Sequence, residues 1–325
     1  MKVGIIGGGA WGTALAQVAA EGGETLLWAR EPEVVESVNA RHENGLFLPG
    51  IGLDASIRAT GDLAHLAGCE ALLVVTPAQH MRAVLQALPR TAAPLILCSK
   101  GMEEATMQLM HEVAREAQPD APVAVLSGPT FAHEVAAKQP AAVTLAIEDA
   151  ALGGRLRDRI ARPWFRPYLS DDVAGAEIGG AVKNVLAIAC GVVDGRGLGL
   201  NARAALISRG FAEMTRFGVA KGGRAETLAG LSGLGDLVLT CSSVSSRNFS
   251  LGKGLGEGRT AAELLADRRT VAEGAFTAPV LRRAAREAGV DMPIVEAVCA
   301  LLSGEARVDA VVEQLLSRPL RAEGV

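Results

Sequence analysis

Aromatic side chains are scarce in this chain. Phe, Trp and Tyr account for 3% of its 325 residues, although hydrophobic residues as a whole account for 49%. The core must therefore be built mainly from aliphatic side chains. A chain of this length is long enough for two domains.

The chain also lacks an excess of basic residues. Its 32 Lys and Arg are outnumbered by 36 Asp and Glu, which gives a formal net charge of −4. Such a protein has no overall positive field for a nucleic acid or an acidic membrane, so we expect neither as a partner. An anionic substrate would have to be bound by local cations.

Metal-binding and disulfide patterns are missing as well. The cysteines are scattered without a CxxC pair, and no His-Glu dipeptide continues into an HExxH motif, so we predict no metal site and reduced thiols. The N-terminus lacks the features of a secretory signal. No apolar run of membrane-spanning length is free of charge. We therefore predict a cytoplasmic protein without membrane insertion.

A glycine-rich turn near the start of the chain carries the strongest positive signal. Gly7, Gly9 and Gly12 form a GxGxxG motif between an apolar run (2–6) and a helical stretch (13–20). The three glycines permit a tight turn, close approach of a pyrophosphate, and close packing of helix on strand, respectively. An ordinary glycine turn is the alternative, but the flanking strand and helix favour a dinucleotide bound at the helix N-terminus.

The type of dinucleotide depends on the end of the second apolar run, 25–29, which Arg30 and Glu31 follow. An acidic residue there accepts hydrogen bonds from the ribose 2′-hydroxyl of NAD, whereas an arginine suits the 2′-phosphate of NADP. Arg30 leads us to favour NADP, and Glu31 keeps NAD open. Arg30 is otherwise an ordinary solvated surface charge.

The rest of the chain divides into two parts. Further apolar runs predict strands at 71–75, 94–98, 122–126 and 141–147, most of them separated by helices. This alternation is typical of a parallel doubly wound sheet. Beyond about residue 170 strand signals nearly vanish, and helices are predicted at 174–193, 202–217, 260–266, 278–288 and 294–303. We therefore expect the α/β class, with a Rossmann-like dinucleotide-binding domain over 1–171 and an all-α substrate-binding domain over 172–325.

Polar residues follow two of the later strands. Lys100 comes after the fourth strand signal, and Gly128 and Thr130 come after the next. Ligands of an open parallel sheet bind beyond the carboxyl ends of its strands. Lys100 would thus offer a cation beside the cofactor, and Gly128 and Thr130 would offer an N–H and a hydroxyl. Ordinary turn chemistry is the alternative.

A lysine occurs inside the first apolar helix of the second part. Lys183, with Asn184, is costly there unless it is paired or lines a cleft. Burial would lower its pKa toward neutrality, which suits proton transfer, whereas a lysine that reaches the surface is the alternative. Asp236, the only charge among residues 231–240, would cap a helix or orient a cation such as Lys183.

Ser246, Arg247 and Asn248 suit a phosphate site. A serine that starts a helix leaves N–H donors for an anion, and the guanidinium fork can bind two phosphate oxygens. A capped surface helix with an exposed arginine is the alternative.

In these segments the chain resembles the NAD(P)-dependent glycerol-3-phosphate dehydrogenases of the bacterial cytosolic type. The resemblance runs from Val3 to about Ser303 and is carried by residues 7–15, 99–101, 127–132, 180–185, 233–237, 246–248 and 271–274. It implies reversible reduction of dihydroxyacetone phosphate to sn-glycerol 3-phosphate, a precursor of phospholipids. Ala10 departs from the serine that many bacterial members carry, which would remove one phosphate contact.

The resemblance also implies roles for individual residues. Lys183 would be the general acid and base, assisted by Asp236 and Lys100. The substrate would contact Lys100, Gly128, Thr130, Lys183, Asn184, Asp236, Ser246, Arg247 and Asn248. With the glycine motif included, the cofactor would contact Gly7, Gly9, Ala10, Trp11, Gly12, Arg30, Lys100, Ala132, Arg247, Val271 and Glu273.

Two other functions stay open at this point. A dehydrogenase of 2-hydroxyacids or sugar acids could share this architecture, and a non-catalytic NADP-binding regulator would need only the cofactor residues of the first domain. The set of Lys100, Lys183, Asp236 and Arg247 favours an enzyme whose active site lies between the two domains. The apolar second domain suggests a homodimer.

Overall fold

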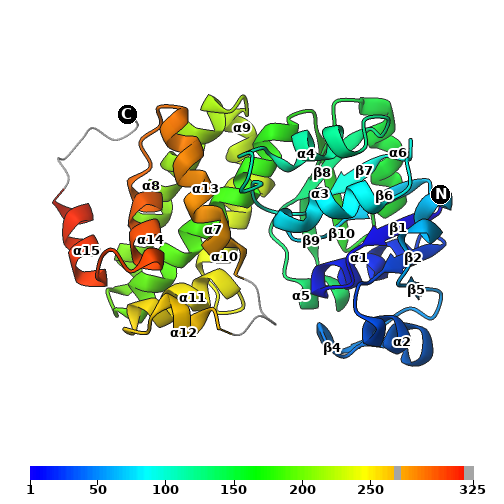
Figure 1. Ribbon diagram of the computed structural model, residues 1–325, viewed down its shortest axis with the longest axis horizontal. Helices are drawn as coiled ribbons and strands as arrows, with labels where there is room; N and C mark the ends of the chain where they lie inside the picture. Colours follow the sequence, from blue (N-terminus) through cyan, green and yellow to red (C-terminus); the bar gives the residue numbers. More distant parts are fainter. Residues whose placement is uncertain (267–271, 318–325) are drawn as a thin grey trace.

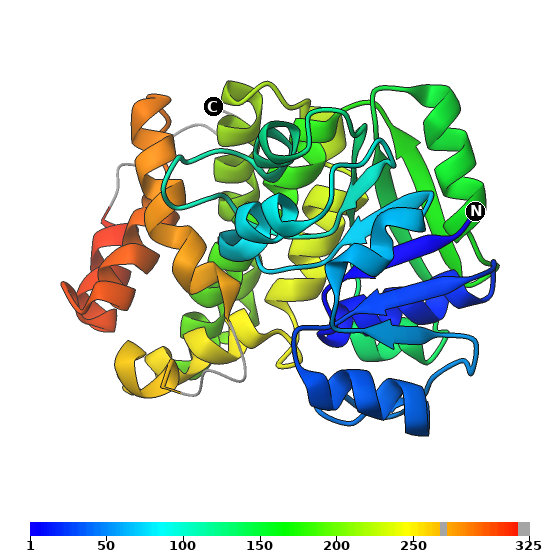
Figure 2. The same cartoon turned by 45° about the vertical axis from the view of Figure 1, so that its right-hand side comes forward.

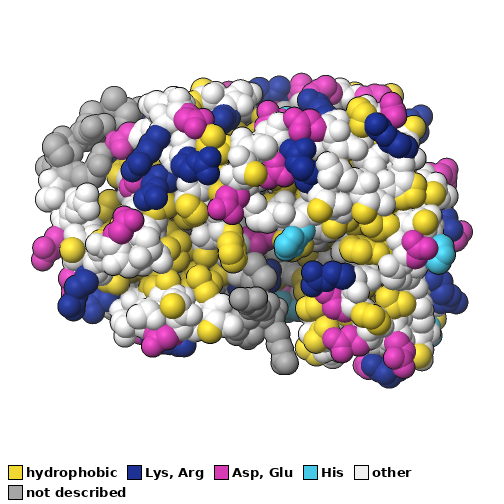
Figure 3. All heavy atoms as spheres, viewed as in Figure 1, with side chains coloured by type: hydrophobic (Ala, Val, Ile, Leu, Met, Phe, Trp, Pro, Cys, Tyr) yellow, Lys and Arg dark blue, Asp and Glu magenta, His cyan; other side chains and the backbone are white. Residues whose placement is uncertain are grey.

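The computed structural model of the protein describes residues 1–266 and 272–317. A sheet half, with strands β1 to β10, lies beside a helical half, with helices α7 to α15, along the long axis of the molecule (Figure 1). Figure 3 shows basic and acidic side chains interspersed over one face of both halves.

Eight strands form one sheet in the order β10-β9-β8-β7-β6-β1-β2-β5. They span Val3–Ile6 (β1), Thr25–Trp28 (β2), Arg58–Thr60 (β5), Ala71–Val74 (β6), Leu95–Leu97 (β7), Val123–Ser127 (β8), Ala141–Ala146 (β9) and Phe165–Ser170 (β10). Neighbouring strands are parallel except for β8 and β9. A separate two-stranded hairpin joins Glu43–Asn44 (β3) and Leu48–Gly52 (β4).

The sheet departs from the prediction in two respects. We expected all strands to be parallel, which is wrong at β9, because β9 runs antiparallel to β8. An apolar run indicates that a strand is buried but does not indicate its direction. The sequence also did not reveal β5 and β10, which form the two edges of the sheet. An edge strand tolerates polar residues and proline, and β10 contains both Arg166 and Pro167.

Helices cover both faces of the sheet (Figure 2). They span Ala10–Ala20 (α1), Pro32–Arg41 (α2), Ala78–Ala87 (α3), Met110–Ala117 (α4), Ala132–Ala136 (α5) and Ala150–Ile160 (α6), with a 3₁₀ turn at Leu63–Gly68. Because successive side chains of a strand point to opposite faces, Ile5 joins a core beneath α1 and α6, whereas Ile6 joins one beneath α3 and α4. The expected α/β class and doubly wound domain are confirmed.

The helical half is built around α7, Val173–Gly195. The other helices span Gly199–Ala220 (α8), Ala225–Leu228 (α9), Asp236–Cys241 (α10), Arg247–Gly256 (α11), Ala261–Leu264 (α12), Glu273–Glu287 (α13), Pro293–Ser303 (α14) and Val308–Leu316 (α15), and a π-helical turn spans Leu231–Gly235. Helix α13 begins earlier than the predicted 278–288 and contains Pro279. The predicted domain division between residues 171 and 172 falls between β10 and α7, and the division itself stays a prediction.

Helix α7 is long and apolar enough to cross a membrane, with a mean hydropathy of 1.5, but 94% of its most apolar stretch is buried inside the protein. Glycines bring α11 directly onto its backbone. A Cβ atom at Gly191 of α7 would lie 2.0 Å from the Phe249 carbonyl oxygen, and one at Gly252 of α11 would lie 1.9 Å from the Ile188 carbonyl oxygen. Close helix packing therefore makes α7 a core helix.

Candidate active site

The glycine motif forms the turn between β1 and α1. Gly7 has φ +126°, and a Cβ atom there would lie 2.9 Å from the Val75 carbonyl oxygen. A Cβ atom at Gly12 would lie 1.8 Å from the Gly7 carbonyl oxygen, whereas one at Gly9 would meet no atom of residues 1–266 and 272–317 within 4 Å. The turn is thus tight at two glycines and open at the third, as a bound pyrophosphate requires.

This turn lies where the strand order reverses, because β1 is flanked by β2 on one side and β6 on the other. Ligands of doubly wound sheets bind at this point. Helix α1 begins at Ala10, and its N-cap, Gly9, provides no side-chain cap. The first N–H groups of a helix lack intrahelical partners, so those at Ala10 and the half-buried Trp11 are suited to phosphate oxygens.

Arg30 and Glu31 both lie just beyond β2, where the adenosine ribose of a dinucleotide would lie. Arg30 Nη2 and Nε donate to Glu31 Oε1 at 2.8 and 3.1 Å, and the Arg30 side chain is 76% exposed. The cation that suits NADP is therefore paired with the carboxylate that suits NAD.

Three predicted residues follow β8. Thr130 Oγ1 donates to the Gly128 carbonyl oxygen at 3.2 Å. A Cβ atom at Gly128 would lie 2.8 Å from Val143 Cα on β9, so the position has no room for a side chain. Ala132 begins α5, which packs on α1.

Lys183, Asp236 and Lys100 come together between the two halves of the molecule. Asp236, fully buried at the start of α10, accepts from Lys183 Nζ at Oδ1 (2.7 Å) and from Lys100 Nζ at Oδ2 (2.5 Å). Lys183 Nζ also donates to Thr240 Oγ1 at 2.9 Å. The interpretation of Lys183 as a surface lysine is therefore wrong, since Lys183 is buried. Asp236 does not cap α10, because Gly235 holds the N-cap position and the Asp236 carboxylate binds the two lysines instead.

The surroundings of Lys183 make its ammonium group a readier acid. Burial lowers its pKa to about 8, and the nearby Lys100 acts in the same direction, while Asp236 opposes both. Two lysines share one carboxylate, so the cluster carries a net positive charge. Such a group can donate and recover a proton near neutral pH.

A second polar cluster lies where α7, α11 and α13 meet. Asn248 Nδ2 donates to Asn184 Oδ1 at 3.0 Å, and Asn248 Oδ1 accepts from the Gly274 N–H at 2.9 Å. Ser246 caps α11 by accepting from the Phe249 N–H at 3.2 Å. The cluster fixes the start of α11.

Two charged residues border this second cluster. Arg247 is exposed in the first turn of α11, which is compatible with either interpretation of this helix start. Glu273 begins α13; burial raises the pKa of its carboxyl, and Arg247, Lys100 and Lys183 pull it back down. The predicted Val271 lies outside the described residues.

Some residues of the site were not anticipated. Thr240 follows Asp236 by one helical turn, a spacing that places the two on one face, and this signal could have revealed it. Ser127 Oγ is buried and has no hydrogen-bond partner among the residues that the structure describes. A Cβ atom at Gly180 of α7 would lie 3.1 Å from that oxygen and 3.4 Å from Lys100 Cγ, so this glycine lets α7 approach the ends of the strands.

Two family models cover most of the chain. The N-terminal model of NAD-dependent glycerol-3-phosphate dehydrogenase matches residues 2–153, and the C-terminal model of the same enzyme matches residues 172–313. The chain belongs to the NAD-dependent glycerol-3-phosphate dehydrogenase family. The resemblance stated from the sequence is thus confirmed, and the chain is an oxidoreductase that uses NAD or NADP.

Individual members of the glycerol-3-phosphate dehydrogenase family agree with this assignment. Glycerol-3-phosphate dehydrogenase [NAD(P)+] of Erythrobacter litoralis is 67% identical over 99% of this chain and 98% of its own length. Glycerol-3-phosphate dehydrogenase [NAD(P)+] 1 of Sphingopyxis alaskensis is 63% identical over 99% of this chain and 98% of its own length. The crystal structure of glycerol-3-phosphate dehydrogenase from Coxiella burnetii superposes with a TM-score of 0.93 at 38% identity, covering 98% of this chain and 99% of that one.

Proposed function

We propose that Lys183 is the general acid and base in the reversible reduction of dihydroxyacetone phosphate to sn-glycerol 3-phosphate, the reaction of this family. The observation that carries the proposal is the contact of Lys183 Nζ with Asp236 Oδ1 at 2.7 Å in a buried site. Bound NADH or NADPH supplies the hydride. As negative charge develops on the substrate carbonyl oxygen, the Lys183 ammonium stabilises it and donates a proton, and in the reverse direction the amine accepts that proton.

Asp236 and Lys100 complete the proposed catalytic group. Because both ammonium groups bind the same carboxylate, their separation is fixed before substrate arrives. Lys100 adds a second positive charge for the substrate, and its position beyond β7 lies at the edge of the sheet where the cofactor would bind.

The phosphate group of the substrate is assigned to the start of α11. Arg247 is exposed and can turn its guanidinium toward two phosphate oxygens. Within the described part of the chain the Ser246 hydroxyl acts as an acceptor, toward the Phe249 N–H, so its own O–H can donate to the ligand. Asn184 and Asn248, joined at 3.0 Å, support this helix start, and Gly128 and Thr130 are assigned to the substrate through the family resemblance.

The cofactor is assigned to the turn between β1 and α1. Gly7, Gly9 and Gly12 with the N–H groups of Ala10 and Trp11 fit a pyrophosphate, since the Cα of Gly9 is open. Ala132, Glu273 and Val271 are assigned to the same ligand through the family resemblance. Because Ala10 has no hydroxyl, the phosphates depend on backbone donors there. Arg30 favours NADP over NAD.

We also propose a cytoplasmic homodimer. All five cysteines are buried free thiols, which suits a reducing compartment. Leu198, Leu200 and Val219 at the two ends of α8 are 45%, 70% and 52% exposed, which suits coverage by a second subunit. Light scattering of the purified chain tests this assignment, and a monomeric mass across the micromolar range would contradict it.

Two substitutions at Lys183 test the catalytic proposal. Lys183→Ala should abolish turnover of dihydroxyacetone phosphate while NADPH still binds, as measured by titration of nucleotide fluorescence. Lys183→Arg keeps the positive charge but cannot release a proton near neutral pH, so it should be inactive as well. Retention of most activity by either variant would refute the acid–base role.

A further inference from the structure

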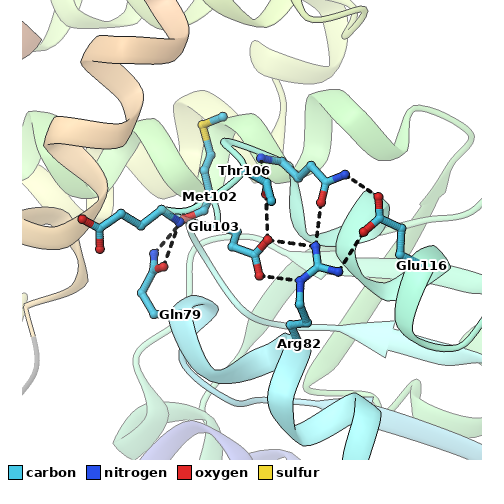
Figure 4. A network of polar contacts seen from close by, with 8 residues as sticks. Gln79, Arg82, Met102, Glu103, Thr106 and Glu116 are labelled. Carbon is cyan, nitrogen blue, oxygen red and sulfur yellow. Dashed lines mark hydrogen bonds and ion pairs between the residues drawn. The ribbon is translucent and has the colours of Figure 1, made fainter.

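Figure 4 shows a polar network around Arg82 of α3 that the proposed mechanism does not use. Arg82 Nε and Nη2 donate to the two carboxylate oxygens of Glu103, each at 2.8 Å. The same guanidinium donates to Glu116 Oε2 and Gln108 Oε1, each at 2.7 Å. Thr106 Oγ1 donates to Glu103 Oε2 at 2.7 Å. The network joins α3 and α4 to the loop that precedes α4.

We propose that the two-pronged ion pair of Arg82 and Glu103 is a clamp that positions Lys100 in the active site. Lys100 lies on the same loop, shortly before Glu103. Arg82 and Glu103 are positioning residues, because among the described residues no hydrogen bond or ion pair joins either of them to Lys100. The inference rests on the roles proposed above for Lys100 and Lys183.

The backbone between Lys100 and Glu103 is held against α3. A Cβ atom at Gly101 (φ +144°) would lie 3.1 Å from Ala78 Cβ of α3 and 3.2 Å from Thr277 Oγ1 of α13, so the loop runs through a narrow space. Gln79 Nε2 donates to the Met102 carbonyl oxygen at 2.7 Å, and Gln79 Oε1 accepts from the N–H of Glu104 at 2.9 Å. Gln79 is thus hydrogen-bonded to the backbone on both sides of Glu103.

The other contacts of the loop leave Lys100 little freedom at its Cα. Ser99 Oγ donates to the Thr76 carbonyl oxygen at 2.5 Å, which holds the residue before Lys100. Met102 is fully buried in the core of the helical half and pairs with Leu109 in an isolated β-bridge. The loop is therefore anchored in both halves of the molecule. The ion pair of Arg82 and Glu103 holds the side of the loop that faces solvent.

The clamp matters for the site because Lys100 reaches Asp236 across the boundary between the halves, at 2.5 Å. A flexible lysine stem alone does not fix such a contact. Displacing a catalytic group by about 1 Å can cost about 100-fold in rate. The Arg82 and Glu103 side chains are 26% and 10% exposed, so their hydrogen bonds are partly shielded from water. The hydrogen bonds from Arg82 lower the Glu103 pKa, which keeps the clamp ionised while the enzyme works.

Steady-state kinetics with dihydroxyacetone phosphate and NADPH test the proposal on the intact chain. Arg82→Met removes the guanidinium fork but keeps an apolar stem, and it should lower kcat/KM about 10- to 100-fold. In a Lys100→Met background the same substitution should have almost no further effect, because residues that act through one group are not additive. A kcat/KM within twofold of the parent, or an equal loss in both backgrounds, would overturn the clamp.

A matched control separates the clamp from the loss of any surface ion pair. Arg115 of α4 pairs with Glu148 at 2.7 Å, and both side chains are exposed. Arg115→Met makes the same change in charge without touching the loop, and its kcat/KM should stay within twofold of the parent. If Arg82→Met shows no cooperative thermal transition, Glu103→Gln replaces it. Glu103→Gln keeps the shape of the side chain. The kcat/KM values expected for Arg82→Met, and those that would overturn the clamp, apply to Glu103→Gln as well.

The pH profile provides a readout that a merely structural role would not move. Lys183 faces Lys100, Asp236, Glu273 and Cys241, and of these Lys100 is the one that repels its ammonium. When Lys100 is displaced, the Lys183 pKa should rise, so the alkaline limb of kcat/KM should move to higher pH in Arg82→Met. A loss of activity with an unmoved limb would mark a structural role and count against the clamp.

Failure of the clamp can be told from failure of the acid–base proposal. The parent and the Arg115→Met control should both lose kcat/KM for reduction above the Lys183 pKa of about 8. If neither shows this limb, the role of Lys183 is wrong. If both show it and Arg82→Met leaves it unmoved, only the clamp is wrong.

Discussion

At the scale of single residues, the carboxylate of Asp236 governs the chemistry by holding two ammonium groups. Asp236→Asn would leave both lysines without their counter-charge. Burial and Lys100 would then lower the Lys183 pKa further below its present value of about 8. We expect the alkaline limb of kcat/KM to shift to lower pH, with a large fall in kcat. An unshifted limb would contradict the pairing of Lys183 with Asp236.

The competition between Arg30 and Glu31 leads to a second residue-scale prediction. Arg30→Ala should raise the KM for NADPH about 10- to 100-fold, the equivalent of one charge-assisted contact of about 1.5–3 kcal/mol. The KM for NADH should change little. Glu31→Gln frees the guanidinium and should lower the KM for NADPH. If the substitutions changed the KM values for NADPH and NADH equally, Arg30 would not bind the 2′-phosphate of NADPH.

The residues of the site differed in how far the sequence could reveal them. Lys183 and Asp236 each interrupt an apolar stretch, so the cost of burying a charge predicted that they have partners. The i, i+4 spacing could have added Thr240 to them. Arg82 and Glu103 lie in different elements, and their pairing depends on the path of a loop that no periodicity encodes.

At the scale of elements, the contact between α7 and α11 depends on the absence of side chains. Gly252→Ala would place a Cβ atom 1.9 Å from the Ile188 carbonyl oxygen, and a backbone atom cannot rotate away. We expect a loss of at least about 1–3 kcal/mol in the free energy of unfolding, measured in urea. Gly154→Ala in α6 is the control, since its Cβ atom would meet no atom of the described residues within 4 Å. This substitution should stabilise the protein by about 0.5–1 kcal/mol. Equal stability of the two variants would contradict the close packing.

The elements of the fold were predictable to different degrees. The buried central strands and α7 have continuous apolar sequences and were predicted from them. The edge strands β5 and β10 were missed because one face or edge meets water, and the antiparallel β9 could not be told from a parallel strand. The short helix α9 carries too few residues for a period to be visible, whereas α12, equally short, was predicted within residues 260–266.

At the scale of the whole molecule, a partly buried ion pair joins the two halves. His111 Nδ1 of α4 lies 2.7 Å from Glu177 Oε2 of α7. Burial alone would lower the His111 pKa, but the hydrogen bond and attraction to Glu177 outweigh burial and raise it; burial raises the Glu177 pKa. Both groups therefore bind protons more tightly in the folded state than in the unfolded state.

This pair predicts a pH dependence of stability. The contribution of His111 is complete below its unfolded pKa of about 6.5 and is lost as the pH rises through the higher folded pKa. His111→Gln should therefore lower Tm most below pH 6.5, and the difference from the parent should shrink at higher pH. Thermal unfolding at several pH values checks this, and a difference independent of pH would contradict it.

The burial of α7 has a consequence for synthesis of the chain. Helices α8, α11 and α13, which cover α7, are encoded after it. A growing polypeptide therefore leaves the ribosome with an uncovered stretch that has the hydropathy of a membrane span. Until the later helices emerge, this stretch offers chaperones and targeting factors an apolar surface, and the charges of Glu177 and Lys183 within it disfavour entry into a bilayer.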